Sequence, residues 1–193
     1  MAEDNFELVK THTESVAIGN AGYFFVICNF KIKHCDIDAL TKDEMFDLII
    51  KNPEYEHVDE FPKTGPRFLD CGPKSHVASS SNFPAQCFTF RLPRSHGPFL
   101  IEKIRPKHYK KIAYNKFDSL LRDLSHKSST NEPMLAVENL LLKAKRAQIY
   151  KFRFATKDLR GPNAAFTHYS EFQEFVLIEP DPRELTFVIF GFD

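Results

Sequence analysis

The segment that decides the fold is residues 172–192, FQEFVLIEPDPRELTFVIFGF, close to the C-terminal end of the sequence. Two apolar stretches, 172–179 and 185–192, flank residues 180–183 (PDPR), a combination of proline and aspartate that is typical of a turn. The pattern predicts a β-hairpin. Because apolar residues occupy both faces of both strands, we expect the hairpin to lie inside a sheet that is covered on both sides.

Other parts of the chain add strands and helices around this hairpin. Residues 22–33 (GYFFVICNFKIK) predict a strand with two apolar faces, and Thr41 with Glu44 forms a capping-box signature that begins a helix. We expect a helix at about 115–125 and another from about 130, whose apolar stripe is Leu135, Val137, Leu140, Leu141 and Ala144. Further strands are expected at 86–92, 99–104 and 149–155. Together these elements predict an α+β (mixed α/β) fold with a single sheet of about five to seven largely antiparallel strands, flanked by about three helices.

Length and composition indicate one domain. A chain of 193 residues can bury a sizeable core, and its twenty Phe residues with no Trp indicate aromatic packing rather than a ligand platform. Residues 52–84 lose hydrophobic periodicity and contain several Pro, Gly and Ser residues, which predict a long loop. We therefore expect a single globular domain over residues 1–193, with a long loop at about 52–84.

The N-terminal residues, the lengths of the apolar runs and the cysteines indicate where in the cell the protein is located. Residues 1–7 are acidic and lack the apolar region of a signal peptide, and no apolar run approaches the ~18 residues that span a bilayer. The four cysteines, Cys28, Cys35, Cys71 and Cys87, are too few for a disulfide scaffold in a chain of this length. We expect a cytoplasmic protein with no membrane partner, and its oligomeric state stays open.

The charges of the chain sum to zero but are segregated along it. Residues 1–60 carry thirteen acidic residues against five Lys or Arg, and residues 61–160 carry twenty Lys or Arg against seven acids. Residues 161–193 return to six acids against one basic residue. Two interpretations stay open: the basic middle forms an anion-binding surface, or folding brings the acidic ends onto it and the charges pair internally.

The basic middle is densest at about residues 91–116, where prolines and a glycine predict loops rather than one amphipathic helix. Loop-borne cations interleaved with Tyr109 and Tyr114 suit phosphate contacts with occasional stacking on bases. We therefore expect a non-catalytic binding or regulatory protein that contacts an anionic partner, either nucleic acid or an acidic protein. The expected anion-binding residues are Arg91, Arg94, His96, Lys103, Arg105, Lys107, His108, Lys110 and Lys111.

Glu174 is an acidic residue inside the apolar strand 172–179. A carboxylate at such a position must be paired, lie at the edge of the sheet or line a cleft. The structural interpretation pairs it with a neighbour such as Lys151 or Arg153.

The functional interpretation rests on a resemblance. The segment 172–178 (FQEFVLI) resembles the late strand of ADP-ribosyltransferases, in which a glutamate in an ExE or QxE context precedes an apolar run and orients the nicotinamide ribose. The resemblance is confined to this short segment, and the spacing of Glu171 and Glu174 departs from an ExE pair. It implies an enzyme with a cleft beside the hairpin, which uses Glu174 with Arg91 or Arg153 as catalytic residues on an NAD-type substrate. No cofactor is expected otherwise.

A third alternative is an inhibitor or immunity-type protein that binds a basic partner through its acidic N-terminal region. The acidic residues concerned are Asp36, Asp38, Asp43, Glu44, Asp47, Glu54, Glu56, Asp59 and Glu60. The spacing of His and Cys residues matches no zinc motif, so we expect no metal site. A separate cluster, Lys143, Lys145 and Arg146, ends an expected helix, where cations complement the helix dipole.

Overall fold

The computed structural model describes residues 6–18, 23–33, 39–57, 95–96, 99–125, 132–153, 171–179 and 183–192. Within these ranges the chain forms three α-helices and a six-stranded antiparallel sheet. The α+β fold class expected from the sequence is therefore confirmed.

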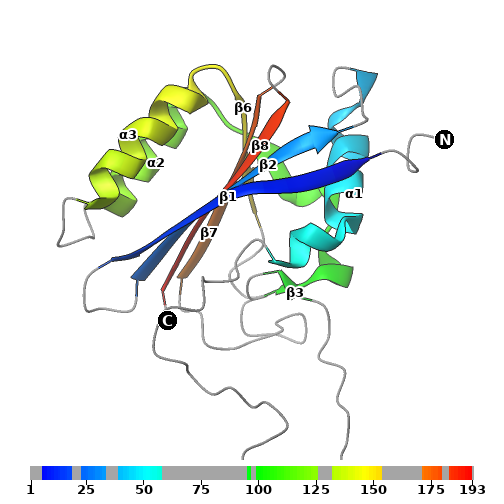
Figure 1. Cartoon of the computed structure of the whole chain (residues 1–193), viewed down its shortest axis with the longest axis horizontal. Helices are drawn as coiled ribbons and strands as arrows, with labels where there is room; N and C mark the ends of the chain where they lie inside the picture. Colours follow the sequence, from blue (N-terminus) through cyan, green and yellow to red (C-terminus); the bar gives the residue numbers. More distant parts are fainter. Residues whose placement is uncertain are drawn as a thin grey trace, which may run out of the picture.

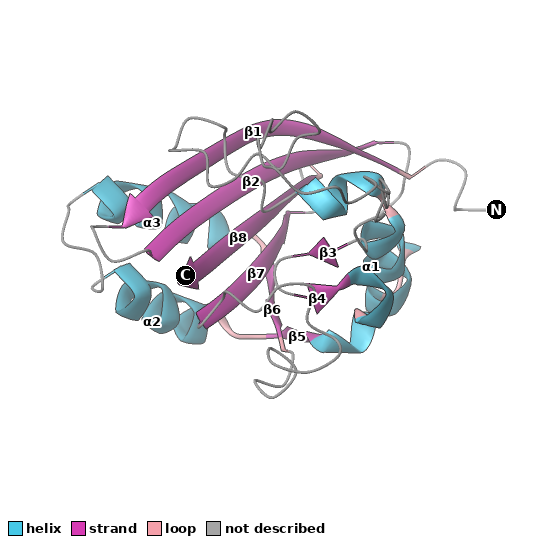
Figure 2. Cartoon of the chain, turned by 90° about the horizontal axis from the view of Figure 1, so that it is seen from below, coloured by secondary structure: helices cyan, strands magenta, loops and turns pink. Residues whose placement is uncertain are grey.

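The large sheet has the strand order β1-β2-β8-β7-β6-β5, and every neighbouring pair is antiparallel (Figure 2). The predicted hairpin forms β7 and β8 at the centre of this sheet, with Glu179 opposite Glu184 at the turn. Its central position confirms the expectation from its two apolar faces. The strand bounds are β1 Glu7–Ile18, β2 Tyr23–Lys33, β5 Tyr109–Lys111, β6 Gln148–Phe152, β7 Glu171–Glu179 and β8 Glu184–Phe192.

Helices cover both faces of the sheet. Helices α2 (Tyr114–Ser125) and α3 (Glu132–Ala144) lie on one face, and α1 (Lys42–Lys51) lies on the other (Figure 1). The α1 side also carries a two-stranded sheet of β3 and β4, together with short 3₁₀ helices. The bounds of these short elements are η3 Pro53–His57, β3 Ser95–His96, β4 Phe99–Leu100, η4 Ile101–Lys103 and η5 Pro106–His108.

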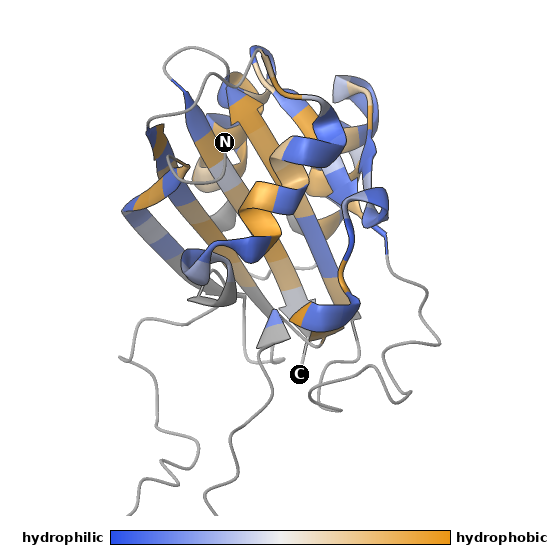
Figure 3. Cartoon of the chain, turned by 90° about the vertical axis from the view of Figure 1, so that its right-hand side faces the viewer, coloured by the Kyte–Doolittle hydropathy of each residue, from blue (hydrophilic) through white to orange (hydrophobic). Residues whose placement is uncertain are grey.

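Alternation along the central strands produces two separate cores. On β7, Val176 and Ile178 pack on the α1 side, whereas Phe175 and Leu177 pack against α2 and α3. All four side chains are buried. Figure 3 views the α1 side, where the strands behind the helices carry long hydrophobic segments. A sheet that is buried on both faces explains why the hairpin sequence lacks polar alternation.

The capping box at the start of α1 is confirmed. The Thr41 hydroxyl accepts a hydrogen bond from the Glu44 N–H at 3.3 Å, and the Glu44 carboxylate accepts one from the Thr41 N–H at 2.9 Å. The Thr41 hydroxyl also donates to the Glu44 carboxylate at 2.6 Å, and this hydrogen bond, together with that from the Thr41 N–H, lowers the pKa of Glu44. The reciprocal contacts satisfy backbone donors that the first helical turn leaves without partners.

Several local expectations need correction. The prediction that Leu135 belongs to the apolar stripe of α3 is wrong, because its side chain is 71% exposed. The strand expected at 99–104 is only Phe99–Leu100, after which the chain turns into η4. Strand β1 was not predicted, because its polar residues occur at positions of both faces. The expected strand 86–92 and residues 58–84 of the expected loop lie outside the described residues, and residues 53–57 of that loop form η3.

Candidate functional site

The predicted site residue Glu174 lies in a buried hydrogen-bond network, with both carboxylate oxygens engaged. Oε2 is hydrogen-bonded to His96 Nε2, and Oε1 accepts a hydrogen bond of 2.7 Å from the Tyr109 hydroxyl. The Tyr109 and Tyr55 hydroxyls are 2.6 Å apart, and His96 Nδ1 lies 2.8 Å from the Tyr55 carbonyl oxygen. All four residues are 0% exposed. The network therefore joins η3, β3, β5 and β7 inside the α1-side core.

The positions of the protons follow from the partners. A carbonyl oxygen only accepts, so His96 Nδ1 carries a proton and donates it to Tyr55. The Tyr109 hydroxyl has a single proton, which it donates to Glu174, so the Tyr55 hydroxyl must donate to Tyr109. One further proton lies between His96 Nε2 and Glu174. Every side-chain donor of the network is then used, as the burial of these groups requires.

This arrangement gives Glu174 partners other than those expected. The described contacts of the two expected partners lie elsewhere: the Lys151 ammonium donates to Gln173 at 3.0 Å and lies over the Phe175 ring, and Arg153 is exposed. Arg91 lies outside the described residues. Because the Glu174 side chain is fully buried, no substrate reaches it in this conformation. The enzyme alternative and its NAD-type substrate stay predictions.

His96 requires a correction. It was expected to bind anions at the surface, but its side chain is 0% exposed and its ring stacks on Tyr55 with 3.8 Å between centroids. Tyr109 was expected to offer a stacking face, but it is buried and its ring stacks on Phe46 at 4.1 Å. Neither residue can contact a partner at the surface.

The pKa of Tyr109 is raised well above its ordinary value, first by burial and then by the nearby charge of Glu174 and the Tyr55 hydroxyl. Burial also raises the pKa of Tyr150. In a low-dielectric site the neutral phenol is favoured, because ionisation would place a second negative charge beside a carboxylate. Tyr109 therefore stays protonated in the folded protein.

Alkaline conditions should destabilise the protein through Tyr109. Since the folded pKa exceeds the unfolded value of about 10, its contribution is fully present below pH ~10 and is lost as the pH rises toward the folded pKa. Each such tyrosine should cost about 1.4 kcal/mol of unfolding free energy per pH unit in that window. Urea unfolding between pH 9 and 11.5 should show a shallower decline for Tyr109→Phe than for the wild type. Equal slopes would contradict this assignment.

The second candidate is a basic surface along β5 and β6, at one edge of the sheet. Lys110 lies directly opposite Lys151, and the Arg153 N–H donates to the His108 carbonyl oxygen at 2.8 Å. Cations of the 91–116 region are thereby brought beside cations from the strand that follows α3. We call Lys107, Lys110, Lys111, Lys151 and Arg153 the basic edge.

Four of the five side chains of the basic edge are exposed. Lys107, Lys110, Lys111 and Arg153 are exposed, and no carboxylate among the described residues forms an ion pair with them. Within the described ranges, the Lys111 ammonium donates to Gln148 at 3.2 Å. Lysines on an edge strand also discourage unwanted strand pairing.

The remaining predicted anion-binding residues are less available. Arg105 donates from Nη1 to the backbone oxygens of Glu102 and Ile104, each at 2.6 Å, and Lys103 lies 3.4 Å from the Glu102 carboxylate. The His108 ring accepts from the Arg105 N–H at 3.1 Å and is half-buried. Arg91 and Arg94 lie outside the described residues. The exposed charge therefore concentrates on the basic edge.

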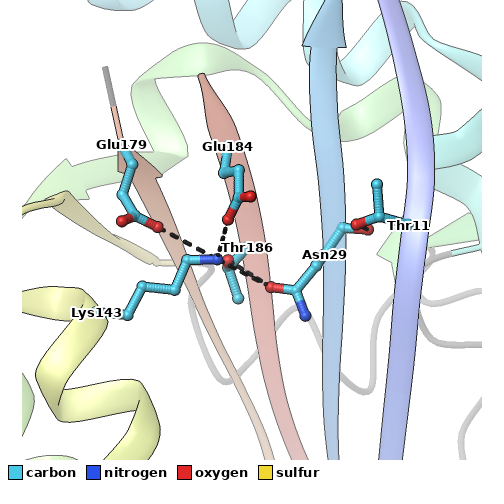
Figure 4. Close-up of polar contacts among 6 residues, drawn as sticks. All are labelled: Thr11, Asn29, Lys143, Glu179, Glu184 and Thr186. Atoms are coloured by element: carbon cyan, nitrogen blue, oxygen red, sulfur yellow. Dashed lines mark hydrogen bonds and ion pairs between the residues drawn. The ribbon is translucent and has the colours of Figure 1, made fainter. Parts of the chain in front are cut away.

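A third cluster centres on Lys143, which extends from α3 toward the central hairpin (Figure 4). Its Nζ donates hydrogen bonds to Glu184 Oε2 at 2.8 Å and Asn29 Oδ1 at 3.2 Å, and it lies 3.2 Å from Glu179 Oε1. Thr186 donates to the same Asn29 oxygen at 2.8 Å. One ammonium thus ties α3 to β2, β7 and β8.

Lys143 offsets an unfavourable cross-strand pair. Glu179 and Glu184 are directly opposite in the β7–β8 register, and like charges in such a pair destabilise a sheet. The sequence indicated only that Lys143 complements the helix dipole, and its position between two glutamates was not predicted. The available signal was its position on the buried face of α3, three residues after Leu140 and seven after Ala136.

The acidic residues of α1 have local structural roles. Glu44 completes the capping box, Asp43 lies 2.7 Å from the Lys42 ammonium, and Asp47 lies 2.8 Å from that of Lys51. Of the other acidic residues in the inhibitor alternative, Glu54 is half-buried on η3, and the side chain of Glu56 is not described. The remaining four, Asp36, Asp38, Asp59 and Glu60, lie outside the described residues. This alternative stays a prediction.

Comparisons with protein-family models, curated proteins and solved structures found no match to this chain. Over the described ranges, no helix is both long and apolar enough to cross a membrane. No group of three or more His, Cys, Asp or Glu residues in the same ranges could hold a metal ion.

Proposed function

We propose that this protein is a non-catalytic binding protein whose basic edge contacts the phosphate backbone of a nucleic acid. The observation that carries the proposal is the gathering of four exposed cations, Lys107, Lys110, Lys111 and Arg153, from two separate segments at β5 and β6, with no ion-paired carboxylate for these four among the described residues. If carboxylates of the acidic segments formed ion pairs with these cations, no positive charge would remain there to bind an anionic partner. A cytoplasmic location stays a prediction.

The chemistry of the edge favours phosphate over base contacts. Lysine ammonium groups act as point charges that neutralise phosphates without reading sequence. Tyr109 is buried, so it provides no platform for stacking on single-stranded bases. We therefore expect binding to duplex and single-stranded nucleic acid alike, with little dependence on sequence.

The test is a salt titration of binding to labelled DNA and RNA, followed by fluorescence polarisation. Affinity should fall steeply with salt, because each neutralised phosphate adds about 0.9 to the slope of log K against log salt for duplex DNA. The combined substitution Lys107→Ala, Lys110→Ala and Lys111→Ala should weaken binding and flatten this slope.

The matched control removes the same charge elsewhere, through Lys31→Ala, Lys33→Ala and Lys145→Ala, three lysines that are exposed on β2 and just after α3. The control should keep the wild-type slope. Identical slopes for both triple variants would exclude the basic edge as the interface. Failure to bind any nucleic acid at low salt would leave an acidic protein as the partner to test.

A further inference from the structure

Strand β1 forms a long edge of the six-stranded sheet, and among the described strands it pairs only with β2 (Figure 2). The backbone N–H and C=O groups of an edge strand can pair with a further strand. The opposite edge, β5, is three residues long and carries Lys110 and Lys111, two features that oppose such pairing. Strand β1 has twelve residues, no proline and a single lysine. It is therefore the edge at which the sheet can be extended.

The middle of β1 alternates between the two sides of the sheet. Thr11 is the extra residue of a β-bulge, because the register with β2 shifts between Lys10 and His12. From His12 onward the pairing with β2 is regular. His12 and Glu14 line a groove beside α3, whereas the Thr13 hydroxyl contacts a cysteine sulfur of the α1-side core. His12 and Glu14 thus share the α3 side of the sheet.

His12 and Glu14 are complementary groups that do not pair within one copy of the chain. Both side chains are exposed, and neither forms an ion pair or a hydrogen bond in the described part of the chain. An imidazole N–H donates a hydrogen bond to a carboxylate, and protonation of the ring strengthens this contact. A second β1 strand can bring to each residue the group that it lacks.

Symmetry restricts how two copies of β1 can pair. A two-fold axis perpendicular to the sheet makes the two strands antiparallel and keeps the α3 sides of both copies on one face. Because residues that lie opposite each other share a face, the axis must pass through a residue position. An axis at His12 or at Glu14 sets that residue opposite its own copy. An axis at Thr13 instead sets His12 opposite the partner's Glu14 on both sides of the axis, and opposite charges in such cross-strand pairs are favourable.

We propose that β1 pairs with β1 of a second copy of this chain, with Thr13 at the two-fold axis and two reciprocal contacts between His12 and the partner's Glu14. The joined sheet is then antiparallel throughout, as the sheet of one copy already is. The basic edge of each copy lies at an outer end of this joined sheet. The interface is therefore independent of the proposed contact with nucleic acid.

The test is sedimentation velocity of the full chain over a series of protein concentrations. The wild type should form a dimer. His12→Glu sets two carboxylates opposite each other, and Glu14→Lys removes the acceptor of both contacts, so each should weaken dimerisation about tenfold. The double variant reverses both charges and should restore the dimer. An axis at His12 or at Glu14 gives no such rescue, because a substituted residue would then face its own copy.

Two controls separate this interface from other causes of association. Glu102→Lys makes the same charge change as Glu14→Lys, but on the exposed η4, and should leave the dimer unchanged. The same result is expected for Leu135→Ser combined with Leu142→Ser, which makes polar the two leucines of α3 that are 71% and 61% exposed. Circular dichroism will show that each variant is folded.

Three results would each overturn the proposal. The first is a wild type that stays monomeric at its highest soluble concentration. The second is a dimer that neither His12→Glu nor Glu14→Lys weakens, or that the leucine variant abolishes. The third is a double variant that dimerises no better than the two single variants, because the predicted register requires rescue.

Discussion

Replacing His96 by alanine should lower the free energy of unfolding by about 3–5 kcal/mol, because it removes one partner of a fully buried, hydrogen-bonded histidine–carboxylate pair. In the wild type His96 and Glu174 are both fully buried and hydrogen-bonded to each other. After the substitution, Glu174 keeps only the hydrogen bond from Tyr109, and the Tyr55 carbonyl oxygen loses its side-chain donor. Both groups are buried, so water cannot replace the lost hydrogen bonds. Each group then pays the cost of desolvation without a hydrogen bond that compensates for it.

Substitutions at Glu174 provide a matched pair for this prediction. Glu174→Gln can keep both contacts, because its amide oxygen accepts from Tyr109 and its amide nitrogen donates to the neutral ring of His96. It should cost about 1 kcal/mol, whereas Glu174→Ala should cost about 3–5 kcal/mol. Urea unfolding at pH 7, followed by circular dichroism, measures each variant. A loss for Glu174→Gln as large as that for Glu174→Ala would contradict the proposed donor pattern.

Phe187→Ala should destabilise the protein by a similar amount, about 3–5 kcal/mol, through the cavity that it leaves. Phe187 lies in the middle of β8, is 0% exposed, and its ring centroid is 5.9 Å from those of Phe30 and Tyr55 and 6.1 Å from that of His96. The side chain therefore supports both the central sheet and the buried network. Neighbours from several different elements cannot collapse together into the space.

The controls for Phe187 separate cavity formation from a general effect of mutation. Phe187→Leu keeps most of the volume and should cost less than about 1.5 kcal/mol. Leu135→Ala removes an apolar side chain that is 71% exposed, and it should change stability by less than about 0.5 kcal/mol. If Phe187→Ala lowered the free energy of unfolding no more than Leu135→Ala, the tight packing around Phe187 would be contradicted.

The candidate sites were only partly predictable. Sequence spacing marked Glu174 as unusual, but it could not identify His96 and Tyr109 as partners, which lie 78 and 65 residues away along the chain. The charge count singled out the basic region, yet it could not separate the exposed Lys107 and Lys110 from the buried His96. Those distinctions depend on which strand pairs with which, and no local pattern specifies that pairing.

What the sequence alone determined is local in origin. The two apolar faces of residues 172–192 determined a central hairpin, and the Thr41–Glu44 signature determined the start of α1, because each depends on neighbours within one turn or one strand. Only the tertiary structure decided where charge is buried and where it is exposed. It placed Lys143 between Glu179 and Glu184, and it set Lys110 opposite Lys151 at an edge. Burial and electrostatic pairing are long-range properties, so they follow from how the sheet assembles rather than from the order of residues within any one element.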